Sequence, residues 1–214
     1  MKLQSYIAGA WVEGSGQGRQ VVDAVHGEPI CAVTSDGLNM AEAVRYARDI
    51  GGNGLRAMTF HERAAALKVV AKHLMEKKED FYQLSLKTGA TRADSWPDIE
   101  GGIGTVFSYA SLVTRELPND VVMVEGDMER LSRHGSFVGR HILTPKVGVA
   151  VHINAYNFPV WGMLEKIAPS LAAGMPVIVK PATPTAYLTQ AVVKEILSTG
   201  ALPEGAVQLI CGSA

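Results

Sequence analysis

The first forty residues place short apolar runs between turn-forming residues. One run covers residues 6–12 and another covers residues 29–34, and the Gly- and Ser-rich residues 13–18 lie between them. Short runs bounded by glycine and serine are typical of β-hairpins. We therefore expect this entry segment to be rich in hairpins.

Apolar residues recur at helical intervals from residue 39 onward. Asn39 and Glu42 have capping-box spacing at the start of a first helix, whose pattern ends at Gly51 and Gly52. Thr59 begins a second helix with the same spacing to an acidic residue. The apolar stripe of this second helix consists of Leu67, Val70, Ala71 and Leu74.

Two further helices and a hairpin are expected before residue 145. One helix covers residues 78–87 and ends at Gly89, because glycine tolerates the left-handed conformation of many helix ends. The other covers residues 99–113, although three glycines lower its helix propensity. Residues 120–144 then alternate apolar and polar side chains, as the strands of a hairpin do.

The last seventy residues follow a different pattern, in which short aliphatic runs alternate with helical segments. The order is β-α-β-α-β, with strands at residues 147–153, 177–179 and 207–210 and helices at residues 160–173 and 186–197. Such strands indicate a parallel sheet covered on both faces, as in nucleotide-binding α/β domains. We expect an α/β fold in which residues 1–145 supply helices and hairpins. Residues 146–214 would form the first, incomplete half of a Rossmann-type domain, with the third strand unpaired.

Composition restricts the class of protein. Of 214 residues, 47% are apolar and 19% are charged, and the formal net charge is -1, which together exclude a disordered chain. Two cysteines are too few for a disulfide scaffold. No apolar run reaches the roughly 18 residues of a membrane span, the first residues lack the apolar core of a signal peptide, and no Lys/Arg stripe is present. We therefore expect a cytoplasmic protein that binds neither nucleic acid nor membranes.

The densest candidate site follows the first of these aliphatic strands and consists of Ile153, Asn154, Ala155, Tyr156 and Asn157. Open α/β sheets bind ligands at the carboxyl ends of their strands. A side-chain amide such as that of Asn157 donates to an oxyanion without titrating. The sequence also suits a simple turn into the next helix, and on the residues alone the turn is the favoured interpretation.

A second candidate site follows the next strand at the same edge of the sheet. Lys180 leaves a buried strand where a nucleotide would lie, and its compact charge suits ribose hydroxyls or a phosphate. A lysine that merely extends into solvent is an equal alternative. Thr183 by itself indicates an ordinary turn or an N-cap residue.

These two sites and their surroundings resemble the N-terminal part of the aldehyde dehydrogenase superfamily. Three family motifs stand in order as Asn157-Phe158-Pro159, a helical Lys-x-Ala-Pro-x-Leu-x-x-Gly at residues 166–174, and Lys180-Pro181. The resemblance covers essentially the whole chain. Residues 56–65, 88–105 and 152–166 are similar to members that oxidise semialdehydes carried on coenzyme A thioesters in phenylacetate or benzoyl-CoA degradation. Residues 89–96 favour the phenylacetate group.

The resemblance implies a role for each candidate residue. Asn157 matches the asparagine whose amide, with a backbone N–H, stabilises the thiohemiacetal oxyanion. Lys180 matches the lysine that contacts the adenosine ribose. The positions that line the cofactor in the family match Ile153, Asn154, Ala155 and Tyr156.

The cofactor expectation depends on Thr183. Many NAD-preferring members carry at this position a glutamate that binds both ribose hydroxyls. A carboxylate there would repel a 2′-phosphate, whereas a threonine can hydrogen-bond to it. The resemblance therefore implies NADP, held by Lys180 and Thr183, with NAD as the alternative.

The catalytic part of the family is expected to be absent. Its nucleophilic cysteine and general-base glutamate match no residue of this chain, so we expect the isolated chain to have no dehydrogenase activity. The alternative hypothesis is a truncated module that binds a nucleotide or a partner without catalysis. Residues 120–144 resemble the family's oligomerisation hairpin, which implies that the full-length enzyme is a homo-oligomer acting on a small CoA-linked semialdehyde.

Other reactive residues have structural interpretations. Cys31 and Cys211 lack neighbours in sequence that would activate a thiol, so we expect both to be buried and inert. His152 is expected to pack in the core. The six histidines show no metal-ligand spacing, so we expect no metal site. The glycines of residues 101–104 lack the flanking strand of a phosphate loop and favour helix packing or a turn.

Overall fold

The computed structural model describes residues 1–212. Its strands are β1 (Gln4–Ile7), β2 (Ala10–Glu13), β3 (Arg19–Val22), β4 (Pro29–Val33), β5 (Met123–Arg130), β6 (Val138–Leu143), β7 (Ala150–Ile153), β8 (Val177–Lys180) and β9 (Val207–Leu209). Its α-helices are α1 (Met40–Tyr46), α2 (Gly52–Ala57), α3 (Phe60–Glu76), α4 (Lys78–Ser85), α5 (Arg92–Trp96), α6 (Gly102–Glu116), α7 (Trp161–Ala172) and α8 (Ala186–Ser198). Two π-helical turns, η1 (Ala47–Gly51) and η3 (Pro97–Gly101), and two 3-10 turns, η2 (Leu86–Thr88) and η4 (Thr183–Thr185), join them.

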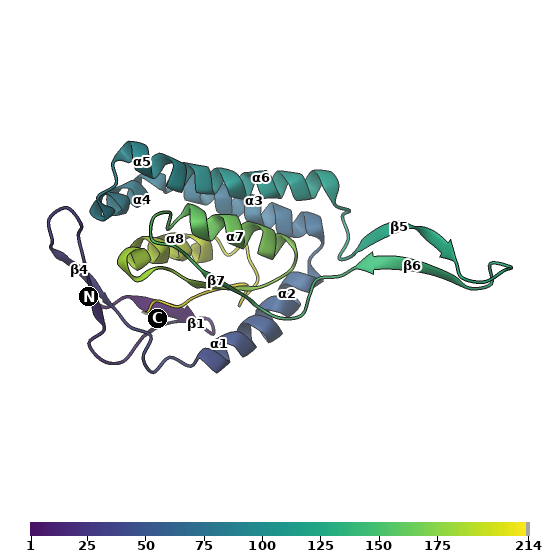
Figure 1. Ribbon diagram of the computed structural model, residues 1–214, viewed down its shortest axis with the longest axis horizontal. Helices are drawn as coiled ribbons and strands as arrows, with labels where there is room; N and C mark the ends of the chain where they lie inside the picture. The colour runs from purple at the N-terminus through teal and green to yellow at the C-terminus, as the bar shows by residue number, and fades with distance from the viewer. Residues whose placement is uncertain (213–214) are drawn as a thin grey trace.

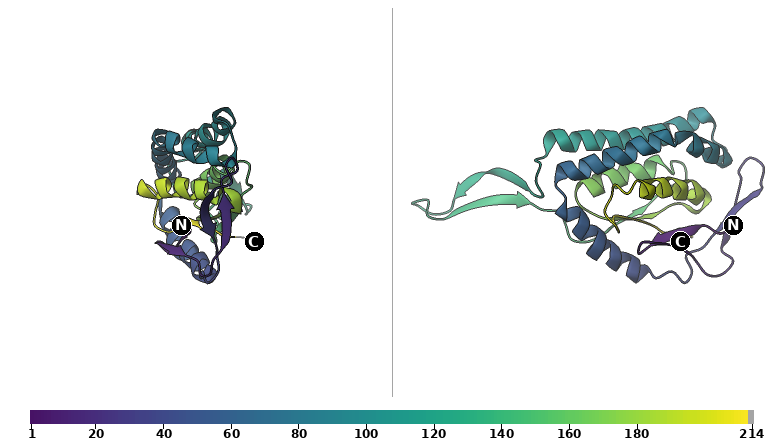
Figure 2. Two further views of the ribbon diagram at one scale, coloured as in Figure 1. Left: turned by 90° about the vertical axis from the view of Figure 1, so that its left-hand side faces the viewer. Right: turned by 180° about the vertical axis from the view of Figure 1, so that it is seen from behind.

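The elements form layers around one sheet (Figure 1). Helices α3 and α6 lie side by side and pack on α7 and α8. Helices α7 and α8 cover one face of the sheet, and α1 with η1 lies against the opposite face, where Ala43 and Ala47 contact Ile178. The same layers are visible from the end and from behind (Figure 2). The sheet is therefore covered by helices on both faces over most of its width.

The five-stranded sheet has the order β2-β1-β9-β8-β7. Strands β7, β8 and β9 are parallel, as the sequence predicts. The expectation of an unpaired third strand is wrong, because β1 pairs antiparallel with β9 and places Tyr6 opposite Leu209. The sheet and its core therefore contain residues from both sides of position 145.

Strand β7 is one edge of the sheet. The prediction that this strand is buried on both faces is wrong, since Val151 is 57% exposed and Ile153 is 74% exposed. Within residues 1–212, no strand pairs with its outer edge. His152, on the opposite face of β7, lies beneath α7 and is buried.

The first helical segment runs past its expected end at Gly51 and Gly52. Asn39 caps α1, and its side chain accepts the N–H of Glu42. Helix α1 continues through η1 into α2. A Cβ on Gly51 would lie 2.1 Å from the backbone oxygen of Gly205, so this glycine permits a close approach between two segments and does not end the helix.

The later helices agree with the expected pattern, except that one of them begins earlier than expected. Thr59 forms the expected capping box at α3, and Gly89 adopts the left-handed conformation, with φ of 85°, after α4 and η2. The helix expected at residues 99–113 begins earlier, at Arg92, where Thr91 caps α5. A Cβ on Gly102 would lie 2.8 Å from Cα of Trp161, which confirms a helix-packing role for this glycine.

Strands β5 and β6 form the expected antiparallel hairpin. The hairpin projects from the layered body as a long arm (Figure 1), which is also seen from behind in the right-hand view of Figure 2. Most of its side chains are exposed, including large apolar ones at Met128, Phe137 and Ile142. None of the helices within residues 1–212 is long and apolar enough to cross a bilayer.

Candidate active site

The carboxyl ends of β7 and β8 lie next to each other. Ile153 is opposite Lys180 in the parallel register, and the N–H of Asn154 donates to the Lys180 carbonyl at 3.0 Å. Because side chains alternate between the faces of a sheet, Ile153 and Lys180 lie on the face opposite α7. This end of the sheet therefore presents an exposed apolar side chain beside a lysine.

Asn154 lies behind that surface. The residue is only 5% exposed, and neither Oδ1 nor Nδ2 of its side chain has a hydrogen-bond partner among the described residues. An unpaired buried amide costs free energy comparable to a lost hydrogen bond. Among the candidate residues, Asn154 is thus turned away from the surface that Ile153 and Lys180 form.

The turn after β7 exposes the candidate residues Ala155, Tyr156 and Asn157. Within residues 1–212, the side chain of Asn157 makes no hydrogen bond, so its amide N–H groups are free to donate. Phe158 follows, and its ring meets that of Trp161 edge to face, with centroids 6.1 Å apart. The turn thus offers the kind of donor that an oxyanion needs.

Asp98 supports this turn from another element. Its Oδ1 accepts the N–H of Val160 at 3.1 Å and that of Trp161 at 2.8 Å. Burial raises the pKa of the Asp98 carboxyl to about 6, against the opposite effect of these two hydrogen bonds. No spacing in the sequence marks Asp98, because its partners lie 62 and 63 residues later.

Asp98 and Asn157 line the same hollow, which has a volume of about 390 Å³. Tyr156, Ser95 and Thr185 also line it. The hydroxyl of Thr185 is buried and has no hydrogen-bond partner in the part of the chain that the structure describes. The hollow therefore joins the turn after β7 to the α5–η3 segment and to the turn after β8.

Lys180 and Thr183 already have partners within the chain. The Lys180 Nζ donates to the Pro181 carbonyl at 3.1 Å, and the Thr183 hydroxyl donates to the Gly212 carbonyl at 3.2 Å. Thr183 is only 9% exposed. Because a hydroxyl has a single proton, Thr183 would have to give up the Gly212 carbonyl to donate to a phosphate.

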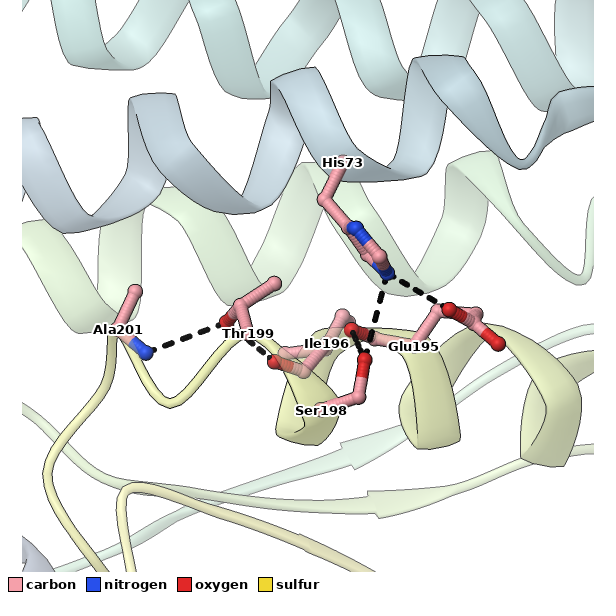
Figure 3. Close-up of polar contacts among 6 residues, drawn as sticks. All are labelled: His73, Glu195, Ile196, Ser198, Thr199 and Ala201. Carbon is pink, nitrogen blue, oxygen red and sulfur yellow. Dashed lines mark hydrogen bonds and ion pairs between the residues drawn. The ribbon is translucent and has the colours of Figure 1, made fainter.

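A second polar cluster joins α3 to α8 (Figure 3). His73 Nε2 lies 2.7 Å from Glu195 Oε2 and 3.3 Å from Ser198 Oγ. A Ser-His-acid triad needs the serine and the acid on different ring nitrogens, whereas here both contact Nε2. This cluster therefore links two helices and does not form a nucleophilic site.

The remaining reactive side chains are buried, as expected. Cys31 and Cys211 are free thiols with at most 4% exposure, and burial raises the pKa of Cys211 to about 12. His152 is 8% exposed, its Nε2 contacts the Ser170 hydroxyl at 3.2 Å, and burial lowers its pKa. A thiol that is not ionised at neutral pH is a poor nucleophile.

Parallel strands that alternate with helices, and a candidate site at the carboxyl ends of those strands, are characteristic of doubly wound α/β proteins. The sequence pattern of the aldehyde dehydrogenase family matches residues 11–214, and the chain belongs to this family.

Curated relatives and solved structures extend beyond this chain. It is 45% identical over 215 residues to the 3,4-dehydroadipyl-CoA semialdehyde dehydrogenase of Aromatoleum evansii, covering all of this chain and 42% of that protein. It is 30% identical over 211 residues to the NAD(+) benzaldehyde dehydrogenase of Pseudomonas putida, covering 95% of this chain and 40% of that one. An NADP-dependent enzyme of E. coli has the same fold, with a TM-score of 0.83 at 24% identity over all of this chain and 42% of its own. The chain thus spans about two fifths of the length of these relatives.

Proposed function

We propose that this chain is the N-terminal, cofactor-binding part of an NAD(P)-dependent aldehyde dehydrogenase that oxidises a CoA-linked semialdehyde to its acid. The observation that carries the proposal is the exposed, uncommitted amide of Asn157 in a turn at the end of β7. Support for the substrate class comes from the relative at 45% identity, whose name gives a CoA-linked semialdehyde. The overall reaction is aldehyde, NAD(P)⁺ and water giving carboxylate, NAD(P)H and two protons.

The strand-end surface fits a nicotinamide dinucleotide. A nicotinamide dinucleotide held there would supply the hydride acceptor for oxidation of the aldehyde. The exposed side chain of Ile153 offers an apolar contact, and the lysine beside it offers a positive charge for ribose and phosphate oxygens. Ala155 and Tyr156 extend this surface into the turn, and the buried, unpaired amide of Asn154 supports it from behind.

Asn157 acts on the substrate oxygen in this proposal. When a nucleophile adds to the aldehyde carbon, negative charge develops on the oxygen, and the Asn157 amide donates a hydrogen bond to it. The amide does this without changing its own protonation state. The nucleophile and the general base are proposed to come from the remainder of the full-length enzyme, so the isolated 214-residue chain should not oxidise aldehydes.

The cofactor and the pathway are the finer parts of the proposal. We favour NADP because no carboxylate stands at Thr183, although its hydroxyl already donates to Gly212. We favour a phenylacetate-derived semialdehyde because of residues 89–96, with a benzoyl-CoA-derived semialdehyde as the alternative. The cytoplasm is the compartment in which such a catabolic enzyme would work, as a homo-oligomer.

The test uses the full-length enzyme, two CoA-linked semialdehydes, one from each pathway, and a free semialdehyde. We expect reduction of NAD(P)⁺ with a higher kcat/KM for the CoA-linked substrates. Asn157→Ala should lower kcat by roughly 10²–10³-fold, as loss of one oxyanion donor does. Asn119→Ala, an exposed asparagine far from the turn in sequence, is the matched control. An enzyme without aldehyde oxidation, or with full activity after Asn157→Ala, would contradict the proposal.

A further inference from the structure

The start of α7 is capped by a residue from outside its own helix. The first N–H groups of a helix have no intrahelical partners, and here Asp98 Oδ1 accepts those of Val160 and Trp161. Asp98 lies on η3, between α5 and α6. The cap is therefore a tertiary contact between two helical segments.

The same turn is held at two further points. The Phe158 carbonyl accepts the N–H of Gly162 at 2.8 Å, and the Pro159 carbonyl accepts the Thr189 hydroxyl at 3.3 Å. Close packing of Gly102 on Trp161 keeps α6 against the start of α7. The backbone from residue 158 to residue 161 thus has a fixed place relative to α6.

Asn157 directly precedes this fixed backbone. Within residues 1–212 its side chain has no hydrogen bond of its own, so the position of the amide depends on the backbone of the turn that carries it. The Asp98 contacts lie three and four residues away along the chain. Movement of the α7 start would therefore move the amide.

Asp98 lines the hollow that it shares with Asn157, but one of its carboxylate oxygens is committed to the start of α7. It is 4% exposed, and its Oδ1 already accepts two N–H groups. A buried carboxyl is also a costly way to cap a helix, because its charged form loses hydration. Asp98 is therefore buried at a cost in free energy, next to the turn that carries Asn157.

We infer that Asp98 is a positioning residue: by holding the N–H groups of Val160 and Trp161, it fixes the turn that aims the Asn157 amide at the substrate oxyanion. This inference rests on the function proposed above. It adds to that function a residue on η3 that controls the oxyanion contact without touching the substrate.

A double-mutant cycle in the full-length enzyme tests this role. Asp98→Ala should lower kcat about tenfold or more, with KM for the aldehyde changed less than about twofold. Asp98→Asn keeps an oxygen acceptor and should recover most of the lost kcat. In an Asn157→Ala background, Asp98→Ala should cost less than about twofold, because coupled residues are not additive. Equal effects of Asp98→Ala in both backgrounds, or no recovery by Asp98→Asn, would overturn the inference.

A second measurement does not depend on activity. Amide hydrogen exchange of the peptide covering residues 157–163 should rise about tenfold in Asp98→Ala, since two of its N–H groups lose their acceptor. Thr59→Ala removes the cap of α3 and controls for a general loss of stability. Unchanged exchange in this peptide would overturn the inference. A wild-type enzyme that shows the protection but oxidises no aldehyde would contradict the proposed function instead.

Discussion

Asp98 makes the stability of the chain depend on pH. Its pKa in the folded state is about 6, raised by burial from an ordinary value of 3.8. The stability that the protonated form contributes is fully present below pH 3.8 and is lost as pH rises through about 6. The loss is on the order of 2–3 kcal/mol.

Asp98→Asn should remove this dependence. As pH rises from 4 to 7, the free energy of unfolding of the variant should increase relative to that of the wild type. Urea denaturation at several pH values measures this difference. Asp80→Asn, at an exposed acid on α4, provides a control. A constant difference between Asp98→Asn and wild type over this range would show that Asp98 does not titrate as described.

Thr183 determines cofactor preference in our proposal. Thr183→Glu places a carboxylate near the ribose site, where it should repel a 2′-phosphate and accept ribose hydroxyls. We expect the ratio of kcat/KM for NADP to that for NAD to fall about tenfold or more in the full-length enzyme, equivalent to about 1.4 kcal/mol.

Pro184→Glu carries the same charge on the next, exposed residue and serves as the matched control. The control should change the ratio by less than about twofold. A preference that stays the same after Thr183→Glu would show that the Thr183 side chain, which donates to Gly212, does not contact the cofactor.

Two helical glycines should respond in opposite ways to alanine. Gly51 lies where a Cβ would meet the Gly205 backbone, whereas a Cβ on Gly104 would meet nothing within 4 Å. Gly51→Ala should destabilise the fold by about 1–3 kcal/mol, because backbone must move. Gly104→Ala should stabilise it by about 0.5–1 kcal/mol, because alanine has less freedom to lose in a helix. Urea denaturation of both variants measures these changes in stability. Equal effects would contradict the close contact between Gly51 and the Gly205 backbone.

The helix starts show which elements the sequence could predict. Asn39 and Thr59 were predictable because a cap lies within three residues of its partner. The capping box of Thr91 with Asp94 is harder to recognise in the sequence, because aspartate replaces the usual glutamate at the third helical position. The sequence around Gly51 does not show that the helical segment continues through it. This glycine is needed for close contact with the Gly205 backbone, more than 150 residues later in the chain.

The candidate site shows the same division between local and distant information. Asn157, Lys180 and Thr183 are candidates that short motifs are enough to suggest. The burial of Asn154 followed from strand alternation and could have been predicted once Ile153 was placed on the exposed face. The contact between Asp98 and the turn after β7 could not have been predicted, because only the packing of α6 on α7 brings Asp98 to that turn.

The β5–β6 hairpin is the surface that we expect to join copies of the full-length enzyme. Val124 and Ile142 are opposite each other and exposed, and His141 lies on the other face of the hairpin. Ile142→Glu should lower the association state, because it places a charge in an apolar contact. Sedimentation velocity measures the change, with His141→Glu as the control. An unchanged association state after Ile142→Glu would exclude this face as the contact.

The order of the sheet has a consequence for biosynthesis. Strand β1 needs β9 as its inner neighbour, and Ser5 and Ala8 form hydrogen bonds to residues more than 199 positions later. A ribosome adds roughly 5–20 residues per second. The first strand is therefore synthesised about 10–40 seconds before its partner. During translation, its apolar side must stay shielded by the β2 hairpin, by early helices or by a chaperone.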